Sequence, residues 1–271
     1  MDELERICIQ VRKDIMLQIG TFGVGHVGGS LSIVELLVVL YRLHMRFDPQ
    51  KPEMSGRDRL IVSKGHSGPA VYAILCNEGF FSRDWLLTLN QPDTNLPSHC
   101  DMNKTPGIDM TTGSLGQGFS CAVGVALASR LCSDGAYIYV ILGDGELQEG
   151  QIWESAMFAA HEFLNNLIVF IDYNDAQIDG RIGQVCGIEP LAEKWRAFGW
   201  EVVEIGDGNS CREVNDGITF AKNTKRPCAV ILHTIKGKGV SFVENSGVLS
   251  HSMVISKENM NLAFMELDSR I

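Results

Sequence analysis

The sequence lacks an excess of positive charge, a long hydrophobic run and any low-complexity segment. Its 271 residues carry 23 Lys and Arg against 33 Asp and Glu, so the formal net charge is −10. A net-negative chain without a basic block is a poor candidate for binding nucleic acid or an anionic membrane. The most apolar stretch, 33–41, is short and contains Glu35, and therefore no bilayer-spanning segment is predicted.

Closely spaced cysteines and a signal peptide are also lacking. No two of the eight cysteines stand at the spacing of a zinc site or a redox pair, so we expect unpaired thiols in a reducing compartment. The first twelve residues are charged and have no apolar core of the signal-peptide type. With 45% hydrophobic and 21% charged residues, the chain is predicted to be a globular, cytoplasmic protein.

Short apolar runs of strand length alternate with helical patterns along most of the chain. Strands are predicted at 59–63, 137–142, 167–171, 201–205 and 228–233. Helices are predicted at 4–19, 32–43, 70–75, 82–89, 113–131, 149–163, 191–198 and 211–222. This order predicts an α/β fold, with a doubly wound and mainly parallel sheet and helices on both faces. We expect residues 1–271 to form one domain, with a less regular tail after Gly239.

Two predicted helix starts carry specific signals. Ser32 and Glu35 have the spacing of a capping box, which predicts that the Ser32 side chain caps the helix that follows. The segment 111–118 (TTGSLGQG) places three glycines at a helix start, where backbone N–H groups can face a ligand.

Polar loops follow two strands that are expected to be neighbours. Ligands of such sheets bind outside the carboxyl ends of the strands. Asp144 follows the strand at 137–142, and Asn174 follows the strand at 167–171, with the main-chain carbonyl of Ala176 two residues further on. Magnesium prefers oxygen ligands of this kind and keeps positions for phosphate. The residues therefore predict a divalent ion that bridges two loops to a diphosphate, which would let an acidic chain bind an anion.

Three histidines lie in glycine-rich or polar loops. His26 lies in GHVGG, His66 in SKGH and His99 in PSH. These positions predict a shared polar pocket, in which neutral imidazole can both donate and accept hydrogen bonds. His44 and His161 lie within predicted helices and are assigned structural roles.

Together these motifs resemble those of the transketolase family of thiamine diphosphate enzymes. The sequence is most similar to the separate N-terminal subunit of a split, two-chain transketolase. GDGELQEG at 143–150, with Asn174 following Asp144 by 30 residues, matches the thiamine diphosphate motif of the family. TTGSLGQG, SKGH and GHVGGS are similar to three further signatures, and the matching covers about residues 20 to 240.

The resemblance implies a diphosphate-binding domain that holds thiamine diphosphate and Mg²⁺, or another divalent cation such as Ca²⁺ or Mn²⁺. The implied metal ligands are Asp144, Asn174 and the Ala176 carbonyl. The implied cofactor contacts are Gly145, His66, Asn174, Gly113, Ser114, Leu115 and Lys236. Lys236 and Lys64 are the weaker candidates, because solvated lysines in glycine-rich loops are common.

The resemblance also implies catalytic roles. His26 and His99 match histidines that hydrogen-bond substrate hydroxyls and help to move protons, and Glu149 matches a glutamate near the subunit contact. Glu149 could equally be a favourable charge at a helix start. His251 is followed by Ser252, whereas the family usually has a His-Gly pair here, so its place in the active site stays open.

A larger departure is the missing half of the active site. Nothing in the sequence matches the pyrimidine-binding domain, whose glutamate activates the cofactor in this family, or the C-terminal domain. The resemblance therefore implies that the partner is a separate C-terminal subunit, in a heterotetramer with two copies of each chain, and that sugar phosphates are the substrates.

The implied reaction transfers a two-carbon ketol unit from a ketose phosphate to an aldose. Alternatives are the alpha subunit of a two-chain 2-oxo-acid dehydrogenase, a relative of deoxyxylulose phosphate synthase, and a non-catalytic cofactor-binding subunit. The Leu-Gln-Glu-Gly run and the three loop histidines favour the transketolase interpretation.

Overall fold

A five-stranded parallel sheet forms the centre of the computed structural model, which describes residues 3–270. Its strands, in spatial order, are β2 (Arg59–Val62), β3 (Ile138–Gly143), β4 (Leu167–Tyr173), β6 (Cys228–His233) and β5 (Glu201–Ile205). All four pairings are parallel, because every connection crosses over through a helix. A small antiparallel pair, β1 (Val24–Gly25) with β7 (Met253–Val254), lies apart from it. The predicted fold class and all five predicted strands are confirmed.

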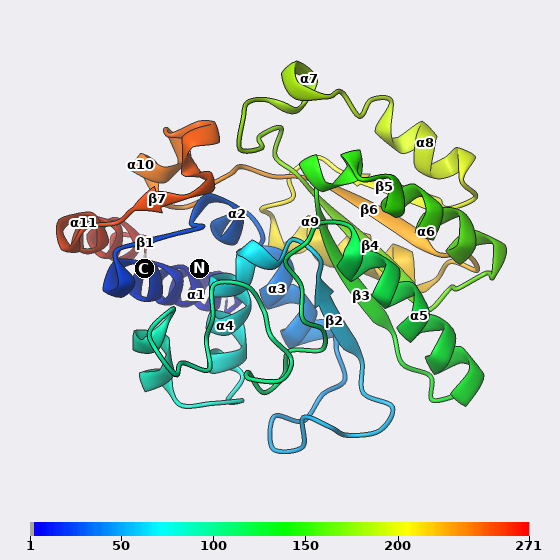
Figure 1. Cartoon of the computed structure of the whole chain (residues 1–271), viewed down its shortest axis with the longest axis horizontal. Helices are drawn as coiled ribbons and strands as arrows, with labels where there is room; N and C mark the ends of the chain where they lie inside the picture. Colours follow the sequence, from blue (N-terminus) through cyan, green and yellow to red (C-terminus); the bar gives the residue numbers. More distant parts are fainter. Residues whose placement is uncertain (1–2, 271) are drawn as a thin grey trace.

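Helices cover both faces of the sheet (Figure 1). One core contains residues of α1 (Glu3–Phe22), α3 (Val34–Val39), α4 (Gly68–Asn77), α9 (Cys211–Lys222) and α11 (Lys257–Asp268). The other contains residues of α5 (Gln117–Cys132), α6 (Gly150–His161) and α8 (Leu191–Ala197). Side chains of β3 alternate between them, with Tyr139 in the first core and Val140 in the second.

Eight short helical segments complete the described part of the chain. They are α2 (Gly28–Leu31), η1 (Leu40–His44), η2 (Gly65–Ser67), η3 (Arg83–Thr88), η4 (Gly145–Gln148), α7 (Ile182–Val185), α10 (Ser241–Glu244) and η5 (Gly247–His251). The side chain of Ser82 caps η3 by accepting a hydrogen bond from the backbone N–H of Asp84.

The predicted capping box at Ser32 is wrong. Helix α3 begins at Val34, and its N-cap residue Ile33 makes no side-chain cap. The Ser32 hydroxyl instead donates to Asp172 Oδ2 at 2.7 Å, and Glu35 pairs with Arg12 at 2.6 Å. Ser32 is thus used to hydrogen-bond the buried carboxylate of Asp172, and Glu35 to pair with the buried guanidinium of Arg12. An unpaired buried charge costs more free energy than an uncapped helix end.

Two further expectations are corrected. The helix predicted at 113–131 begins only at Gln117, because Gly116 adopts a left-handed conformation with φ of 82° and leaves 113–116 as a loop. The tail after Gly239 is more regular than expected, since it contains the 12-residue helix α11. A Ser256–Asn259 capping box starts this helix, and Leu267 is buried in the core that α11 shares with α1.

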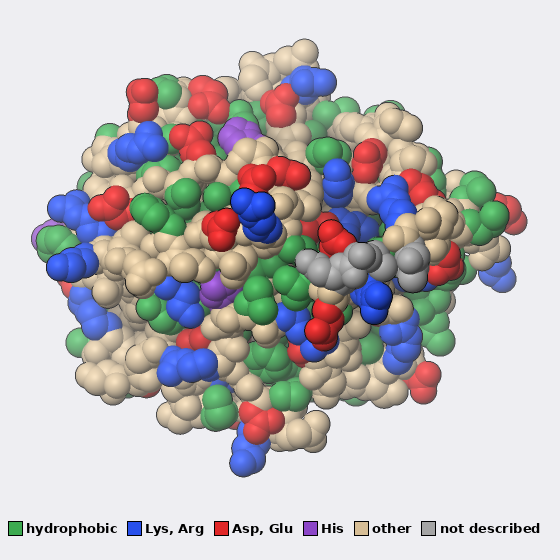
Figure 2. Space-filling model, turned by 180° about the vertical axis from the view of Figure 1, so that it is seen from behind, with side chains coloured by type: hydrophobic (Ala, Val, Ile, Leu, Met, Phe, Trp, Pro, Cys, Tyr) green, Lys and Arg blue, Asp and Glu red, His purple; other side chains and the backbone are tan. Residues whose placement is uncertain are grey.

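The surface carries charges of both signs. Figure 2 shows Lys and Arg side chains interspersed with Asp and Glu on one face, without a large region of a single sign. Across residues 3–270, no helix is both long and apolar enough to cross a membrane. All eight cysteines are free, as expected, although the Cys8 and Cys211 sulfurs lie 3.7 Å apart.

Candidate functional site

A cavity of about 380 Å³ opens at the carboxyl ends of β2, β3, β4 and β6. This volume lies within the usual range of small-molecule sites, roughly 300–1,000 Å³. The predicted site residues that line it are His26, His66, His99, Gly113, Leu115, Asp144, Gly145, Glu149, Asn174, Ala176 and Lys236. Ser114 is exposed and is not among the lining residues. The structure therefore brings together all but one of the residues selected from the sequence.

Asp144 joins the loops that follow β3 and β4. Its side chain is buried, and Oδ1 accepts a hydrogen bond from the backbone N–H of Gly145 at 2.8 Å. Oδ2 accepts from the backbone N–H groups of Asn174, at 2.9 Å, and Asp175, at 2.7 Å. The register of the two strands, with Gly143 opposite Asp172, brings the loops side by side as predicted.

Asn174 supplies a second oxygen at the same place. Its Oδ1 atom is buried and has no hydrogen-bond partner, while Nδ2 donates to Asp172 Oδ2 at 2.9 Å. A buried carbonyl oxygen without a hydrogen-bond partner costs folding free energy, and binding a cation would remove this cost. Carboxylate and amide oxygens are hard ligands, and so this pair fits a divalent ion such as Mg²⁺.

The third predicted metal ligand is engaged differently. The Ala176 carbonyl accepts a hydrogen bond from Lys236 Nζ at 2.6 Å. A divalent ion on that carbonyl would be repelled by an ammonium group in this position. Among residues 3–270 there is also no group of three or more His, Cys, Asp or Glu side chains arranged to hold a metal. The Ala176 carbonyl is therefore free for a metal only if Lys236 moves away from it, whereas Asp144 and the Asn174 amide oxygen need no such change.

Burial and neighbouring charges shift the ionisation of these groups. Burial, together with the nearby Asp172 carboxylate, raises the pKa of Asp144 to about 6. Burial lowers the pKa of Lys236, although Asp144 acts in the opposite direction. Burial also acts to raise the pKa of Asp172, but the Lys64 ammonium and the hydrogen bonds from Lys64, Thr234 and Ser32 together outweigh it and hold that pKa below its usual range.

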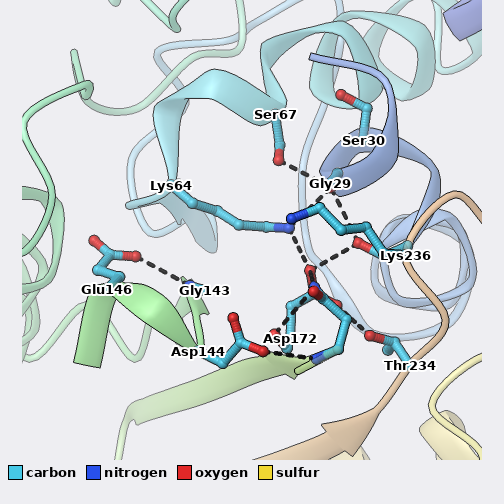
Figure 3. A network of polar contacts seen from close by, with 12 residues as sticks. Gly29, Ser30, Lys64, Ser67, Gly143, Asp144, Glu146, Asp172, Thr234 and Lys236 are labelled. Carbon is cyan, nitrogen blue, oxygen red and sulfur yellow. Dashed lines mark hydrogen bonds and ion pairs between the residues drawn. The ribbon is translucent and has the colours of Figure 1, made fainter. Parts of the chain in front are cut away.

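Asp172 and Lys64 form the centre of a buried polar network (Figure 3). Lys64 Nζ donates to Asp172 Oδ2 at 2.6 Å and to the Gly29 carbonyl at 2.8 Å. Their side chains are only 1–2% exposed. Sequence reasoning treated Lys64 as a weak candidate and gave Asp172 no role. The sequence feature that points to Asp172 is its position directly after the continuous apolar run of β4. A carboxylate buried at such a position needs a partner of opposite charge.

Glu146 is a second buried carboxylate that sequence reasoning missed. It accepts hydrogen bonds from the Ser63 hydroxyl at 2.5 Å, the Gly116 N–H at 2.8 Å and the Gly143 N–H at 3.1 Å. This residue therefore ties the glycine-rich loop before α5 to the loop after β3. Glu149, by contrast, is exposed at the N-cap position of α6, on the rim of the cavity.

Four histidines gather at the other end of the cavity. The ring of His26 lies 5.4 Å from that of His66, 5.6 Å from that of His99 and 5.3 Å from that of His251, centroid to centroid. The predicted pocket of three loop histidines is present, and His251 belongs to it. Burial lowers the pKa of every one of them, that of His251 to about 4, so all four rings are neutral near pH 7.

Gly113 and Gly145 both line the cavity, but a side chain would meet different surroundings at the two positions. A Cβ atom at Gly113 would stand 3.5 Å from Cδ2 of the His99 ring, against the side of the cavity that the histidine lines. At Gly145, a Cβ atom would lie only 2.9 Å from Gln177 Oε1. A side chain would therefore be in ordinary van der Waals contact at Gly113, whereas at Gly145 the Gln177 side chain would have to move.

Sequence comparisons place this arrangement among known proteins. Residues 5–263 match the family described as the transketolase, thiamine diphosphate binding domain. Over 259 residues the chain is 52% identical to a 6-deoxy-6-sulfo-D-fructose transketolase subunit of a Clostridium species, and the match covers 95% of this chain and 94% of that subunit. It is 39% identical to an apulose-4-phosphate transketolase subunit of Actinobacillus succinogenes, covering 98% and 96% of the two chains.

Solved structures agree with these relatives. The transketolase of Campylobacter jejuni superposes with a TM-score of 0.93 at 30% identity, over 99% of this chain and 43% of that one. A transketolase variant of Pichia stipitis gives a TM-score of 0.93 at 28% identity, over 98% and 41%. The chain thus spans about two fifths of the length of these structures.

Proposed function

The chain belongs to the transketolase family, and we propose that it is the N-terminal subunit of a two-chain transketolase. In this proposal it helps to transfer a two-carbon ketol unit from a ketose phosphate to an aldose. The observation that carries the proposal is the oxygen pair at the ends of β3 and β4, where the buried Asp144 carboxylate lies beside an Asn174 amide oxygen without a partner.

Asp144, Asn174 and the Ala176 carbonyl would hold Mg²⁺, or Ca²⁺ or Mn²⁺ in its place. His66 and the Gly145 backbone would bind the diphosphate together with the metal, and Gly113 and Leu115 would contact the aminopyrimidine. When bound, thiamine diphosphate supplies the electron sink that two-carbon transfer requires. Lys236 would leave the Ala176 carbonyl and turn to the diphosphate, because this exchange removes an ammonium from beside the metal.

The histidines would handle the protons of the substrate. His26 and His99 line the cavity beside Gly113, and their rings are neutral near pH 7. A neutral imidazole can accept a proton from a hydroxyl and return it, which suits repeated proton transfer within one turnover. The rings therefore position substrate hydroxyls and carry protons, whereas the carboxylates at the other end hold charge.

A separate C-terminal subunit would complete the active site. In this proposal residues 1–271 act as one diphosphate-binding domain, and the partner supplies the pyrimidine-binding domain with the activating glutamate. Glu149, exposed at the rim of the cavity, would lie at the contact. The relatives named as transketolase subunits match this chain along most of their length, which supports a separate partner subunit. For the assembly we propose a heterotetramer with two copies of each chain, located in the cytoplasm.

These relatives also decide between the enzyme classes. Both named relatives are transketolase subunits, and neither is a 2-oxo-acid dehydrogenase or a deoxyxylulose phosphate synthase. The two are named for a sulfonated and a phosphorylated sugar, and so sugars with an anionic terminus are the substrate class to test first.

The decisive experiment is to measure thiamine diphosphate binding to the Asp144→Ala variant, with and without Mg²⁺. We expect metal-dependent binding to be abolished, because the variant loses the charged metal ligand. Asp175→Asn is a matched control, since it removes a surface charge that pairs with Arg181, while asparagine tolerates the left-handed φ of 57° and keeps the backbone N–H that donates to Asp144. Cofactor affinity that survives Asp144→Ala would contradict the proposed site.

A further inference from the structure

The buried carboxylate of Asp172 lies directly behind one of the proposed metal ligands. Asp172 is 1% exposed, and its Oδ2 atom accepts the hydrogen bond from Asn174 Nδ2 at 2.9 Å. The two residues stand two positions apart, where β4 ends and the loop begins. This contact joins the polar network under the cavity to the metal site.

The amide of Asn174 has two ends of similar shape and opposite chemistry. Its oxygen can bind a cation, whereas its NH₂ group can only donate hydrogen bonds. Shape alone does not decide which end faces the cavity, so the neighbouring groups must. An ionised carboxylate only accepts hydrogen bonds, and Asp172 therefore attracts Nδ2 and repels Oδ1. Oδ1 is left as the end without a protein partner.

Asp172 is itself held by donors from three other segments (Figure 3). Ser32 Oγ, between α2 and α3, donates to Oδ2 at 2.7 Å. Lys64 Nζ, after β2, donates to Oδ2 at 2.6 Å, and Thr234 Oγ1, after β6, donates to Oδ1 at 2.5 Å. With both oxygens engaged, the carboxylate cannot turn away from Asn174. The Lys64 ammonium also compensates its charge in the interior.

We propose that Asp172 is a positioning residue, which fixes the amide of Asn174 so that its oxygen faces the metal. This inference rests on the proposed function, because it requires Asn174 to be a metal ligand. Partners that orient metal ligands change metal affinity by about 10–100-fold when they are replaced.

The test exchanges the two side chains. Mn²⁺ binding to the full chain, in the presence of thiamine diphosphate, is measured by electron paramagnetic resonance. Asp172→Asn should weaken binding by about 10–100-fold, because the amide of Asn174 can then adopt either orientation. Asn174→Asp should also weaken it, although a carboxylate is a good ligand, because two carboxylates then face each other.

The double variant Asp172→Asn/Asn174→Asp should bind Mn²⁺ more tightly than Asn174→Asp alone. In it, the amide introduced at 172 donates to the carboxylate introduced at 174, and one negative charge remains near Lys64. The double variant therefore carries the test even if Asp172→Asn does not fold. Thermal unfolding without metal separates lost affinity from lost stability. Asp58→Asn is the matched control and should leave Mn²⁺ affinity unchanged, since it neutralises another buried carboxylate, paired with Arg46, that does not line the cavity.

The outcomes distinguish this inference from the proposed function. Unchanged Mn²⁺ affinity in Asp172→Asn, or a double variant no tighter than Asn174→Asp, would overturn the positioning role. If Asp144→Ala loses Mn²⁺ in the same series, the metal site stands and only the role of Asp172 is wrong. If Asp144→Ala binds Mn²⁺ as the natural chain does, the metal site itself is misassigned.

Discussion

The two ends of the cavity are built in opposite ways. At the carboxylate end, Asp144 and Asp172 accept hydrogen bonds through both of their oxygens. At the histidine end, no ring nitrogen of His26, His66, His99 or His251 has a hydrogen-bond partner within residues 3–270. One end is therefore held by the chain itself, and the other presents free donors and acceptors to a ligand.

This difference matches the chemistry proposed for each end. A diphosphate and its metal are bound throughout turnover, so their ligands benefit from being fixed in advance. Groups that exchange protons with successive substrates need free nitrogens whose protonation can change. The comparison can be tested by changing one end and measuring the function of the other.

The largest effect is expected at the histidine end. His26→Gln or His99→Gln, in the enzyme assembled with its partner, should reduce kcat/KM for ketol transfer by about 10²–10⁴-fold, the usual contribution of a proton-transferring group. Thiamine diphosphate affinity should change little, because the variants leave the oxygen site intact. A loss of cofactor affinity as large as the loss of rate would show that the two ends are not separate.

Lys64→Met should produce the largest loss of stability. It leaves Asp172 buried without its cation, which costs about 3–5 kcal/mol, measured as the free energy of unfolding in urea. Arg181→Met is the matched control, because Arg181 pairs with Asp175 at the surface, where such pairs contribute about 0–1 kcal/mol. Equal effects of the two variants would contradict the view that the carboxylate end depends on a buried ion pair.

A smaller effect concerns the dependence of stability on pH. Burial lowers the pKa of folded His251 to about 4, below its unfolded value near 6.5, so the unfolded chain binds more protons between these values. This contribution to stability is complete above pH 6.5 and is lost as the pH falls towards 4. We expect His251→Gln to flatten the fall of the unfolding temperature between pH 7 and pH 5. A slope equal to that of the natural chain would show that His251 is not buried as a neutral ring.

The smallest expected effect is at the exposed Ser114. It stands between Gly113 and Leu115 in the sequence but is not among the lining residues. Ser114→Ala should leave cofactor affinity and kcat/KM unchanged, as measured beside His99→Gln in the assembled enzyme. A clear loss of cofactor affinity would restore Ser114 to the predicted contacts.

Several features of the molecule could be predicted from local patterns. The five strands are continuous apolar runs, and their alternation with helices allows few arrangements other than a parallel sheet. The cavity residues were found for the same reason, since glycine-rich and polar loops after such strands meet at one edge. The resemblance to the transketolase family is confirmed by the match over residues 5–263.

Other features depend on residues far apart in the chain. Ser32 has the pattern of a helix cap, but Asp172, 140 positions away, takes its hydroxyl. The sequence of helix α11 has only a weak amphipathic pattern, and the helix is held in position by packing against α1. Lys64 is a loop lysine in the sequence and a buried counter-ion in the structure.

The sequence by itself therefore determined the sheet, most of its helices and the group of residues that meet at the strand ends, because these follow from hydrophobic periodicity and from loop chemistry. Only the tertiary structure decided which carboxylates are saturated, which amide oxygen is left free and which rings face one another. These outcomes depend on burial and on partners that a linear pattern does not contain. The proposed role of Asn174 needs both the sequence and the tertiary structure. The motif identifies the residue, and the network around Asp172 orients its amide.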